Sequence, residues 1–449
     1  GLQNQGATCY MNSLLQQLYC VPQLRSRICA VDLGDVEKRR RKKNRDKEKE
    51  RNREEKQIVI QLQIMFANLR ESLRRFYDTS DFCKTLKDFD GNPINVGQQM
   101  DANEFFNMLF DKLDQQLRPT PQARLLRTIF GGYLSNQLIS EECGHSSERP
   151  EPFYSITIEI KNKSRIEESL DLFIEGEMLA GVNKYFCERC GIGRDTRKRC
   201  VIKTLPNILV MNLKRFEFDY NNMTNFKLND KCAFPMEIDM TPYTVEGVAR
   251  REALEAANID GDVNEDDDND ENVRKSKRRA RQSLPPHALP PLQPPQYYKY
   301  RLTGITVHQG TADSGHYYSY IRERESPSRV DNDDKSENRW FEFNDTNVTP
   351  FDPADIPKEC FGGSVTFTRF DPETGEHIEL SRDKVNNAYI LFYERTEWFE
   401  CNDDAEKPSE PASDIPRATS QLELSNADLP TVVDSDISDK ENDDNEVQK

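Results

Sequence analysis

A cysteine stands at the start of a predicted helix, in the opening stretch "GLQNQGATCYMNSLLQQLY". Cys9 follows a turn that contains Gly6, and the apolar residues after it recur at helical spacing. Backbone N–H groups at a helix start are unpaired and the helix dipole favours negative charge, so a thiolate is stabilised there. The sequence therefore offers Cys9 as a nucleophile, and the alternative is a buried cysteine that only fills space.

A thiol nucleophile needs a base, and the chain has 5 histidines. His316 is the preferred candidate, because in "DSGHYYSYI" a glycine turn leads directly into an aromatic strand and holds the imidazole at the strand start. His308, at the end of the preceding strand, is the best competitor. His287 lies in a Pro-rich segment and His377 in a predicted polar turn, so both are weak candidates. Taken alone, His316 could equally be an ordinary surface histidine.

A third group must hold the imidazole in the right tautomer. In "RWFEFNDTNVT", Asn344 and Asp345 follow a strand that we expect to pair beside the strand of His316. An Asn-Asp pair at a strand end is most often only a turn. Asn4 precedes Cys9 in the same loop, and its amide could donate to a developing oxyanion beside the Cys9 N–H.

The elements that must position these residues divide the chain into a helical front half and an antiparallel rear half, an α+β arrangement. Helical periodicity is predicted within 1–21, where Pro22 marks the end, and within 58–77 and 99–118. Alternating apolar residues predict strands at 154–160, 208–218, 297–308, 316–321, 339–344 and 388–394.

Two segments are predicted to lie outside this core. Residues 246–296 combine an acidic run, a basic run and a Pro-rich end, and we expect a disordered insertion. Residues 396–449 are expected to form an acidic disordered tail, since 402–449 hold 14 acidic and 4 basic residues and no aromatic residue. That tail carries −10 of the formal net charge of −17.

Composition limits the class of protein. Outside the tail the chain is only mildly acidic, so nucleic acid is not expected as a partner. The 11 cysteines, without a signal peptide or a membrane-length apolar run, indicate a reducing compartment and no transmembrane segment. Because the sequence does not open with Met, we expect a domain of a longer protein.

Together these segments resemble the ubiquitin-specific proteases. The opening stretch is similar to their cysteine box, and "GHYYSYI", "RWFEFND" and "NAYILFYER" are similar to their histidine box. "QQMDANEFFNMLFDKLD" and "VIKTLPNILVMNLKRFEFD" resemble the intermediate blocks of the family. The resemblance spans 1–245 and 297–395, and "CAFPMEIDMTPYTVEGVA" with "CFGG" is most similar to the fat facets type.

The resemblance implies a papain-like fold over 1–395, with a helical thumb (about 1–120), a β-finger extension (about 133–205) and an antiparallel palm. It implies that Cys9 is the nucleophile, His316 the general base, Asn344 the orienting residue and Asn4 the oxyanion donor. Asp345, beside Asn344, could share the orienting role. The implied reaction is hydrolysis of the bond after the C-terminal glycine of ubiquitin, with ubiquitin and ubiquitinated proteins as partners.

Asp101 and Glu104 match the acidic positions at which the family meets the arginines of the ubiquitin tail, and Tyr317 is expected to line the tail channel. The alternatives are that both acids decorate a solvated helix face and that Tyr317 belongs to the core. For the whole chain, the alternatives are a protease for another ubiquitin-like modifier and an inactive ubiquitin-binding scaffold. The cytoplasm is the expected location, and the basic run 274–282 raises nuclear import as an addition.

No cofactor is expected to be required for the reaction. "YFCERCG" places Cys187 and Cys190 in a knuckle typical of zinc sites, which need four ligands. The family supplies a second pair upstream, but in "SEECGH" only Cys143 is present, and Ser140 replaces the other cysteine. His145 could substitute, although Cys-x-His is a tight spacing for one tetrahedron. The sequence therefore predicts an incomplete site, with a relic knuckle preferred over bound zinc.

Overall fold

The computed structural model divides the chain into two compact units, Gly1–Glu400 and Cys401–Lys449. It describes only residues of the first unit, namely 1–32, 57–88, 91–140, 142–259, 291–324, 339–370 and 377–399. Residues 400–449 of the predicted tail and the basic run 274–282 lie outside these residues, and so does most of the predicted insertion. The expectation of disorder is wrong for residues 396–399, since Phe399 N donates to Asn207 Oδ1 (3.0 Å) and Phe399 O accepts from Asn207 Nδ2 (2.9 Å). Within the described ranges, none of the helices has the length and apolarity needed to span a bilayer.

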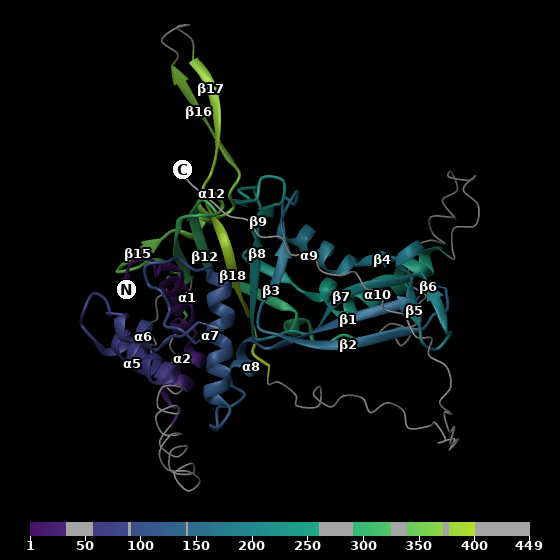
Figure 1. Ribbon diagram of the computed structural model, residues 1–449, viewed down its shortest axis with the longest axis horizontal. Helices are drawn as coiled ribbons and strands as arrows, with labels where there is room; N and C mark the ends of the chain where they lie inside the picture. The colour runs from purple at the N-terminus through teal and green to yellow at the C-terminus, as the bar shows by residue number, and fades with distance from the viewer. Residues whose placement is uncertain are drawn as a thin grey trace, which may run out of the picture. The chain divides into compact units, whose positions relative to one another are not determined.

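The helices of the first 130 residues gather on one side of the main sheet (Figure 1). Within the described residues they are α1 (Cys9–Tyr19), α2 (Pro22–Cys29), α5 (Gln57–Glu71), α6 (Ser80–Thr85), α7 (Ala102–Leu117) and α8 (Leu125–Phe130). Pro22 was predicted to mark the end of the first helix. The helix does end before Pro22, at Tyr19, and Pro22 is also the first residue of α2, where its missing N–H costs no hydrogen bond.

The main sheet has eight strands in the order β15-β14-β13-β12-β18-β8-β3, with β11 also pairing β12. The strands are β3 (Ile156–Glu159), β8 (Ile208–Lys214), β11 (Glu237–Asp239), β12 (Lys299–Gly310), β13 (Gly315–Arg322), β14 (Trp340–Asn344), β15 (Asn347–Phe351) and β18 (Asn386–Arg395). Its pairs are antiparallel, as predicted, except that β3 runs parallel to β8.

A second, four-stranded sheet extends from one side of the main sheet (Figure 1). Its order is β2-β1-β7-β4, from β1 (Gly132–Ser140), β2 (Ser146–Phe153), β4 (Glu177–Leu179) and β7 (Thr196–Thr204). A short hairpin of β5 (Tyr185–Cys187) and β6 (Ile192–Arg194) lies at its far end, and α9 (Ile166–Glu175) contacts β3 and β7. These strands occupy the region predicted as fingers.

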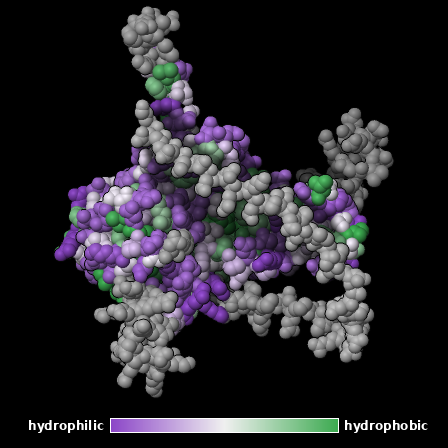
Figure 2. Space-filling model, viewed as in Figure 1, coloured by the Kyte–Doolittle hydropathy of each residue, from purple (hydrophilic) through white to green (hydrophobic). Residues whose placement is uncertain are grey.

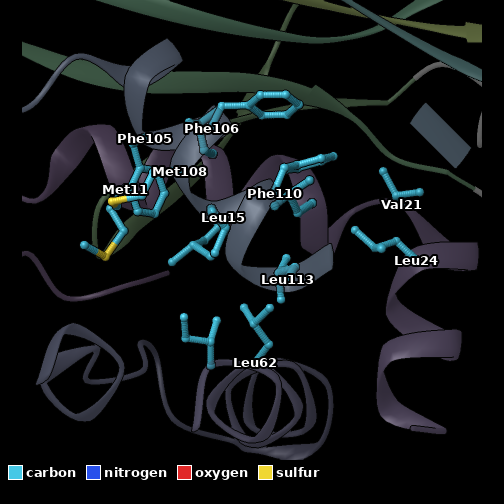
Figure 3. Close-up of a cluster of buried hydrophobic side chains, with 14 of the residues drawn as sticks. Met11, Leu15, Val21, Leu24, Leu62, Phe105, Phe106, Met108, Phe110 and Leu113 are labelled. Carbon is cyan, nitrogen blue, oxygen red and sulfur yellow. The ribbon is translucent and has the colours of Figure 1, made fainter. Parts of the chain in front are cut away.

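Helix α1 is the centre of the helical layer. Ten of its eleven residues are buried, and it contacts both β13 and α7. Figure 3 shows Met11 and Leu15 of α1 together with Phe105 and Met108 of α7. Truncating one such buried side chain to Ala typically costs about 2–5 kcal/mol. The residue at the start of α1 therefore has a fixed position relative to β13.

Two predictions about the remaining segments are wrong. The insertion was predicted to begin at 246, but α10 (Val245–Ile259) continues the fold there, with Val248 buried in the core. His377 was predicted to lie in a polar turn and is the first residue of β17 (His377–Asp383), which pairs with β16 (Ser364–Phe370). This hairpin extends away from the main sheet (Figure 1). Val365 and Phe367 of β16 are exposed, and Figure 2 shows hydrophobic surface on this hairpin.

Among the described residues, the remaining elements are β9 (Phe216–Asp219), β10 (Thr224–Lys227), α12 (Ile356–Cys360) and four short 3-10 turns. Strands β9 and β10 form a separate hairpin. Sequence periodicity does not resolve this hairpin because 208–218 reads as one continuous run of apolar and charged residues.

Candidate active site

Cys9 is the first residue of α1, and its side chain is 3% exposed. The loop before it is organised around Asn4, whose Oδ1 accepts hydrogen bonds from Gly6 N (3.0 Å) and from Thr8 N (3.0 Å) and Oγ1 (3.1 Å). Gly6 is required because its φ is +139° and an added Cβ would lie 2.8 Å from Val96 O. The loop thus delivers Cys9 to the helix start that the sequence predicted.

His316 lies opposite Cys9 at the start of β13 and is held from behind by Asn344. Its Nε2 lies 2.8 Å from Asn344 Oδ1, across the antiparallel pair of β13 and β14. Asn344 Nδ2 donates to Glu342 Oε1 (3.2 Å), which fixes the amide with its oxygen toward the imidazole. Since an amide oxygen can only accept, Nε2 carries a hydrogen and Nδ1 is the nitrogen left for Cys9.

The imidazole of His316 holds its proton more tightly than an ordinary histidine. Its hydrogen bond with Cys9 is the largest cause and raises the pKa of His316 to about 9. Burial acts in the opposite direction, and the bond to Asn344 adds to the increase. His316 is therefore suited to accept the proton of the Cys9 thiol and to keep it near neutral pH.

His308, the competing histidine, is in a different state. Burial is the main cause, and the charge of Lys227 the second, of a decrease in the pKa of His308 to about 3. Its ring lies between Phe216 and Tyr317, at centroid distances of 5.1 and 4.6 Å. His308 is thus a neutral packing residue.

Asp345 does not share the contact with His316 that the sequence left open. Its carboxylate accepts hydrogen bonds from Asn4 Nδ2 (3.0 Å) and from Asn12 Nδ2 (2.8 Å). The residue has a φ of +49° and its backbone oxygen accepts from Leu2 N (2.8 Å). Asp345 therefore ties the loop before Cys9 to the end of β14, and acts on His316 only through its charge.

Asn12 was missed in the sequence analysis. It lies one turn after Cys9 on α1 and is 2% exposed. A polar residue in a run predicted to be buried was the available signal, because buried amides need partners. Nothing in the sequence pointed to Asp345 as that partner.

The three residues predicted to bind the substrate, Asp101, Glu104 and Tyr317, differ in their exposure and in their hydrogen bonds. Asp101 caps α7, with Oδ1 accepting from Asn103 N (2.8 Å) and Glu104 N (3.1 Å). Its Oδ2 accepts from Tyr389 OH (2.6 Å) and Tyr317 OH (3.4 Å). Tyr317 is 3% exposed, whereas Glu104 is exposed in the first turn of the helix. Glu104 is thus the one whose carboxylate faces solvent.

A second cluster lies at the far end of the finger sheet. Cys143, His145, Cys187 and Cys190 place their ligand atoms within 4.8 Å of one another. The sulfur atoms of Cys143 and Cys187 are 3.9 Å apart, and His145 Nδ1 lies 3.4 Å from the sulfurs of Cys187 and Cys190. A tetrahedral zinc ion with Zn–S near 2.3 Å and Zn–N near 2.0 Å separates its ligands by about 3.5–3.8 Å.

The tight Cys-x-His spacing does not prevent Cys143 and His145 from facing one metal ion. Gly144 separates the two upstream ligands and has a φ of +67°, a left-handed conformation that turns Cys143 and His145 toward one point. Ser140, which replaces a family cysteine, has its Oγ 3.1 Å from Cys143 Sγ. Hydrogen bonds from Ser140 and from the His145 backbone lower the pKa of Cys143 to about 6, and zinc binds cysteine as the thiolate. The donor set fits zinc.

Comparison with known proteins places this arrangement in one family. Residues 1–393 match the family described as ubiquitin carboxyl-terminal hydrolase. The chain is 34% identical over 399 residues to human ubiquitin carboxyl-terminal hydrolase 34, and 35% identical over 396 residues to the hydrolase puf of Drosophila melanogaster. Each alignment covers 88% of this chain, but only 10% and 9% of those much longer relatives.

A solved structure has the same fold. A chain of the SAGA DUB module of Ubp8, Sgf11, Sus1 and Sgf73, bound to monoubiquitin, matches with a TM-score of 0.58 at 22% identity. The match covers 89% of this chain and 69% of that one. The α+β fold and the family resemblance predicted from the sequence are both confirmed: the chain belongs to the ubiquitin carboxyl-terminal hydrolases.

Proposed function

We propose that this chain is a thiol-dependent deubiquitinase, which hydrolyses the bond after the C-terminal glycine of ubiquitin on protein lysines or in polyubiquitin. The observation that carries the proposal is the position of His316, whose Nε2 lies 2.8 Å from Asn344 Oδ1 and whose pKa is raised chiefly by its interaction with Cys9. Family membership supports ubiquitin as the substrate.

The first step is the formation of the nucleophile. Asn344 holds the hydrogen on Nε2 of His316, so the lone pair of Nδ1 faces Cys9. The thiol gives its proton to Nδ1, and the thiolate attacks the carbonyl carbon of the terminal glycine. Because the pKa of His316 is raised to about 9, the imidazolium is retained until the leaving group needs its proton.

The second step is the collapse of the tetrahedral intermediate. The Cys9 N–H and the second hydrogen of Asn4 Nδ2 donate to the oxyanion, while Asp345 holds the first hydrogen and with it the direction of the amide. The C–N bond breaks, and His316 protonates the departing lysine amine. Water then attacks the thioester with His316 as the base, which releases the ubiquitin carboxylate and restores Cys9.

The exposed carboxylate of Glu104 would meet an arginine of the ubiquitin tail. Asp101 would act with it mainly by charge, since its oxygens already accept four hydrogen bonds. Tyr317 is 3% exposed and packs in the core, so it would act on the tail only through Asp101, to which its hydroxyl donates (3.4 Å).

The test is covalent capture of purified chain by ubiquitin that carries a C-terminal electrophile. Wild type should form the adduct and hydrolyse a fluorogenic ubiquitin amide, and Cys9→Ala should do neither. Cys29→Ala is the matched control, because Cys29 is an exposed cysteine of the same helical layer. Tight binding of ubiquitin without capture would favour the scaffold, and capture only by an electrophile of another modifier would favour that modifier.

We also propose that Cys143, His145, Cys187 and Cys190 bind a structural zinc ion. The support is the match between their spacing and a tetrahedral site, described above. Elemental analysis should find one zinc per chain, and Cys190→Ala should abolish it. Cys200→Ala, on β7 of the same finger region, should retain the metal. Wild-type protein purified without chelators that contains no zinc would refute the proposal.

A further inference from the structure

The ammonium group of Lys227 connects three backbone carbonyls close to the candidate active site. Lys227 is the last residue of β10, and its Nζ donates to Val385 O (2.7 Å), His308 O (2.9 Å) and Gly310 O (3.3 Å). An ammonium has three hydrogens, so its donors match the three acceptors in number. The contacts join the end of β12 to the residue before β18.

Two of these carbonyls flank the residue that faces the proposed base. In the register of β12 and β13, Gln309 pairs with His316 and Gly310 pairs with Gly315. Lys227 thus holds the backbone on both sides of Gln309. Strand β13, which carries His316, lies between β14 and β12. The end of β12 is therefore the neighbour of His316 on the side opposite Asn344.

The turn between the two strands transmits this position. It has four residues, and Thr311 N donates to Ser314 O (2.8 Å). Gly310 has a φ of +132°, and a Cβ there would lie 2.5 Å from Ser314 O. Because the turn is short and has little conformational freedom, a shift of the end of β12 also shifts the start of β13, where His316 lies. On the other side Gly315 N is fixed by Gln99 Oε1 (3.2 Å).

The position of Lys227 is electrostatically unfavourable. Burial is the main cause, and the neighbouring charge of Arg215 the second, of a decrease in the pKa of Lys227 to about 7. Burying an amine is costly unless its hydrogens are bonded. The three carbonyls offset that cost at this place in the fold, which a shorter or apolar side chain could not do.

We propose that Lys227 is a positioning residue for His316. By holding the carbonyls of His308, Gly310 and Val385, it fixes the end of β12, and through the tight turn it aims the imidazole at Cys9. This inference rests on the proposed function, since it assigns to Lys227 the geometry of the same nucleophile and base.

The experiment compares Lys227→Met with Lys231→Met. Methionine keeps the aliphatic length and removes the donors, and Lys231 lines the same surface cavity as Lys227 but is exposed. Two readouts are measured: hydrolysis of a fluorogenic ubiquitin amide, and the pH dependence of Cys9 alkylation by iodoacetamide, followed by mass spectrometry of the Cys9 peptide. The second does not require ubiquitin.

For Lys227→Met we expect kcat to fall about 10- to 100-fold with KM within about twofold, since charge-assisted hydrogen bonds are lost. The alkylation midpoint should move to higher pH, because Cys9 loses part of its contact with the imidazole. Lys231→Met should match wild type in both readouts. Lys227→Arg, which keeps a cation with N–H donors, should recover at least part of kcat.

The proposal is overturned if Lys227→Met retains the wild-type alkylation profile, or if the two methionine variants change alike. It is also overturned if Lys227→Met fails to fold while Lys231→Met folds, since Lys227 would then serve only the stability of the fold. If wild type is not captured by the ubiquitin electrophile, the proposed function fails, and the alkylation comparison still decides the role of Lys227.

Discussion

Replacing Asn344 by Ala removes the acceptor that holds His316 and leaves the rest of the site in place. A hydrogen bond to a charged group contributes about 1.5–3 kcal/mol. If the whole of this is expressed in the transition state, kcat/KM falls by about 10- to 150-fold, at 1.36 kcal/mol per factor of ten. The hydrolysis of a fluorogenic ubiquitin amide measures this directly.

The same substitution has a signed effect on pH dependence. The bond from Asn344 is one of the causes that raise the pKa of His316 to about 9, so its removal lowers that pKa. The imidazolium must protonate the leaving amine, so activity declines as pH rises through this pKa. Wild type should lose activity around pH 9, and Asn344→Ala should lose it at a lower pH.

The matched control is Asn347→Ala. Asn347 pairs with Asn344 in the β14–β15 hairpin and is exposed, and its Oδ1 accepts from Arg75. This control should leave kcat/KM and the alkaline limb unchanged. The assignment of Asn344 as the orienting residue is refuted if its alanine variant folds, keeps wild-type kcat/KM and loses activity at the same pH as wild type.

Three further substitutions test other contacts. Asp345→Ala should lower kcat by about 10- to 100-fold, since Asn4 loses the partner that directs its amide. It should shift the alkaline limb of the pH profile less than Asn344→Ala does. An unchanged kcat would show that Asn4 does not stabilise the oxyanion. Glu104→Gln should raise KM for ubiquitin substrates by about 2- to 10-fold with little change in kcat, because a surface ion pair contributes little binding free energy. If steady-state kinetics find KM unaltered, Glu104 does not contact the ubiquitin tail. Gly144→Ala should weaken zinc binding by about 5- to 30-fold in a competitive chelator titration, because a left-handed alanine costs roughly 1–2 kcal/mol. Gly181→Ala, with a φ of +64° and open space around it, introduces the same strain at a residue that does not separate two ligands, and an equal loss of zinc there would contradict the reasoning.

The elements that carry the nucleophile and the base could be predicted from the sequence, because the apolar periodicity and the catalytic residue types pointed to the same segments. The helix after Cys9 and the strand after His316 are both clear from the spacing of their apolar residues, and the structure contains both. The α+β fold follows from the same pattern. That His316 and Cys9 come into contact could be inferred only from the family resemblance, since 306 positions of sequence separate them and pairing between distant strands leaves no local signal.

Other features depend on contacts that have no sequence pattern. The spacing of Cys143 and His145 was thought too tight for zinc because the left-handed conformation of Gly144 is a property of the folded turn. The sequence left open that Asp345 helps to orient His316, whereas in the structure its carboxylate binds Asn4. A side chain next to a strand end can point to either side, so the sequence could not decide between the two. A charged, Pro-rich segment masked the start of α10, whose apolar residues are few.

The position of β18 has a consequence for the timing of activity. It is the last strand of the main sheet along the chain, yet it lies between β12 and β8 in the interior of that sheet. Until residues 386–395 have been synthesised, β12 and β8 have no common neighbour, so the strands β11 to β15 and the pair β3–β8 form two separate groups. A partial chain that ends before Asn386 would therefore contain every proposed active-site residue and lack the strand that joins the two groups into one sheet.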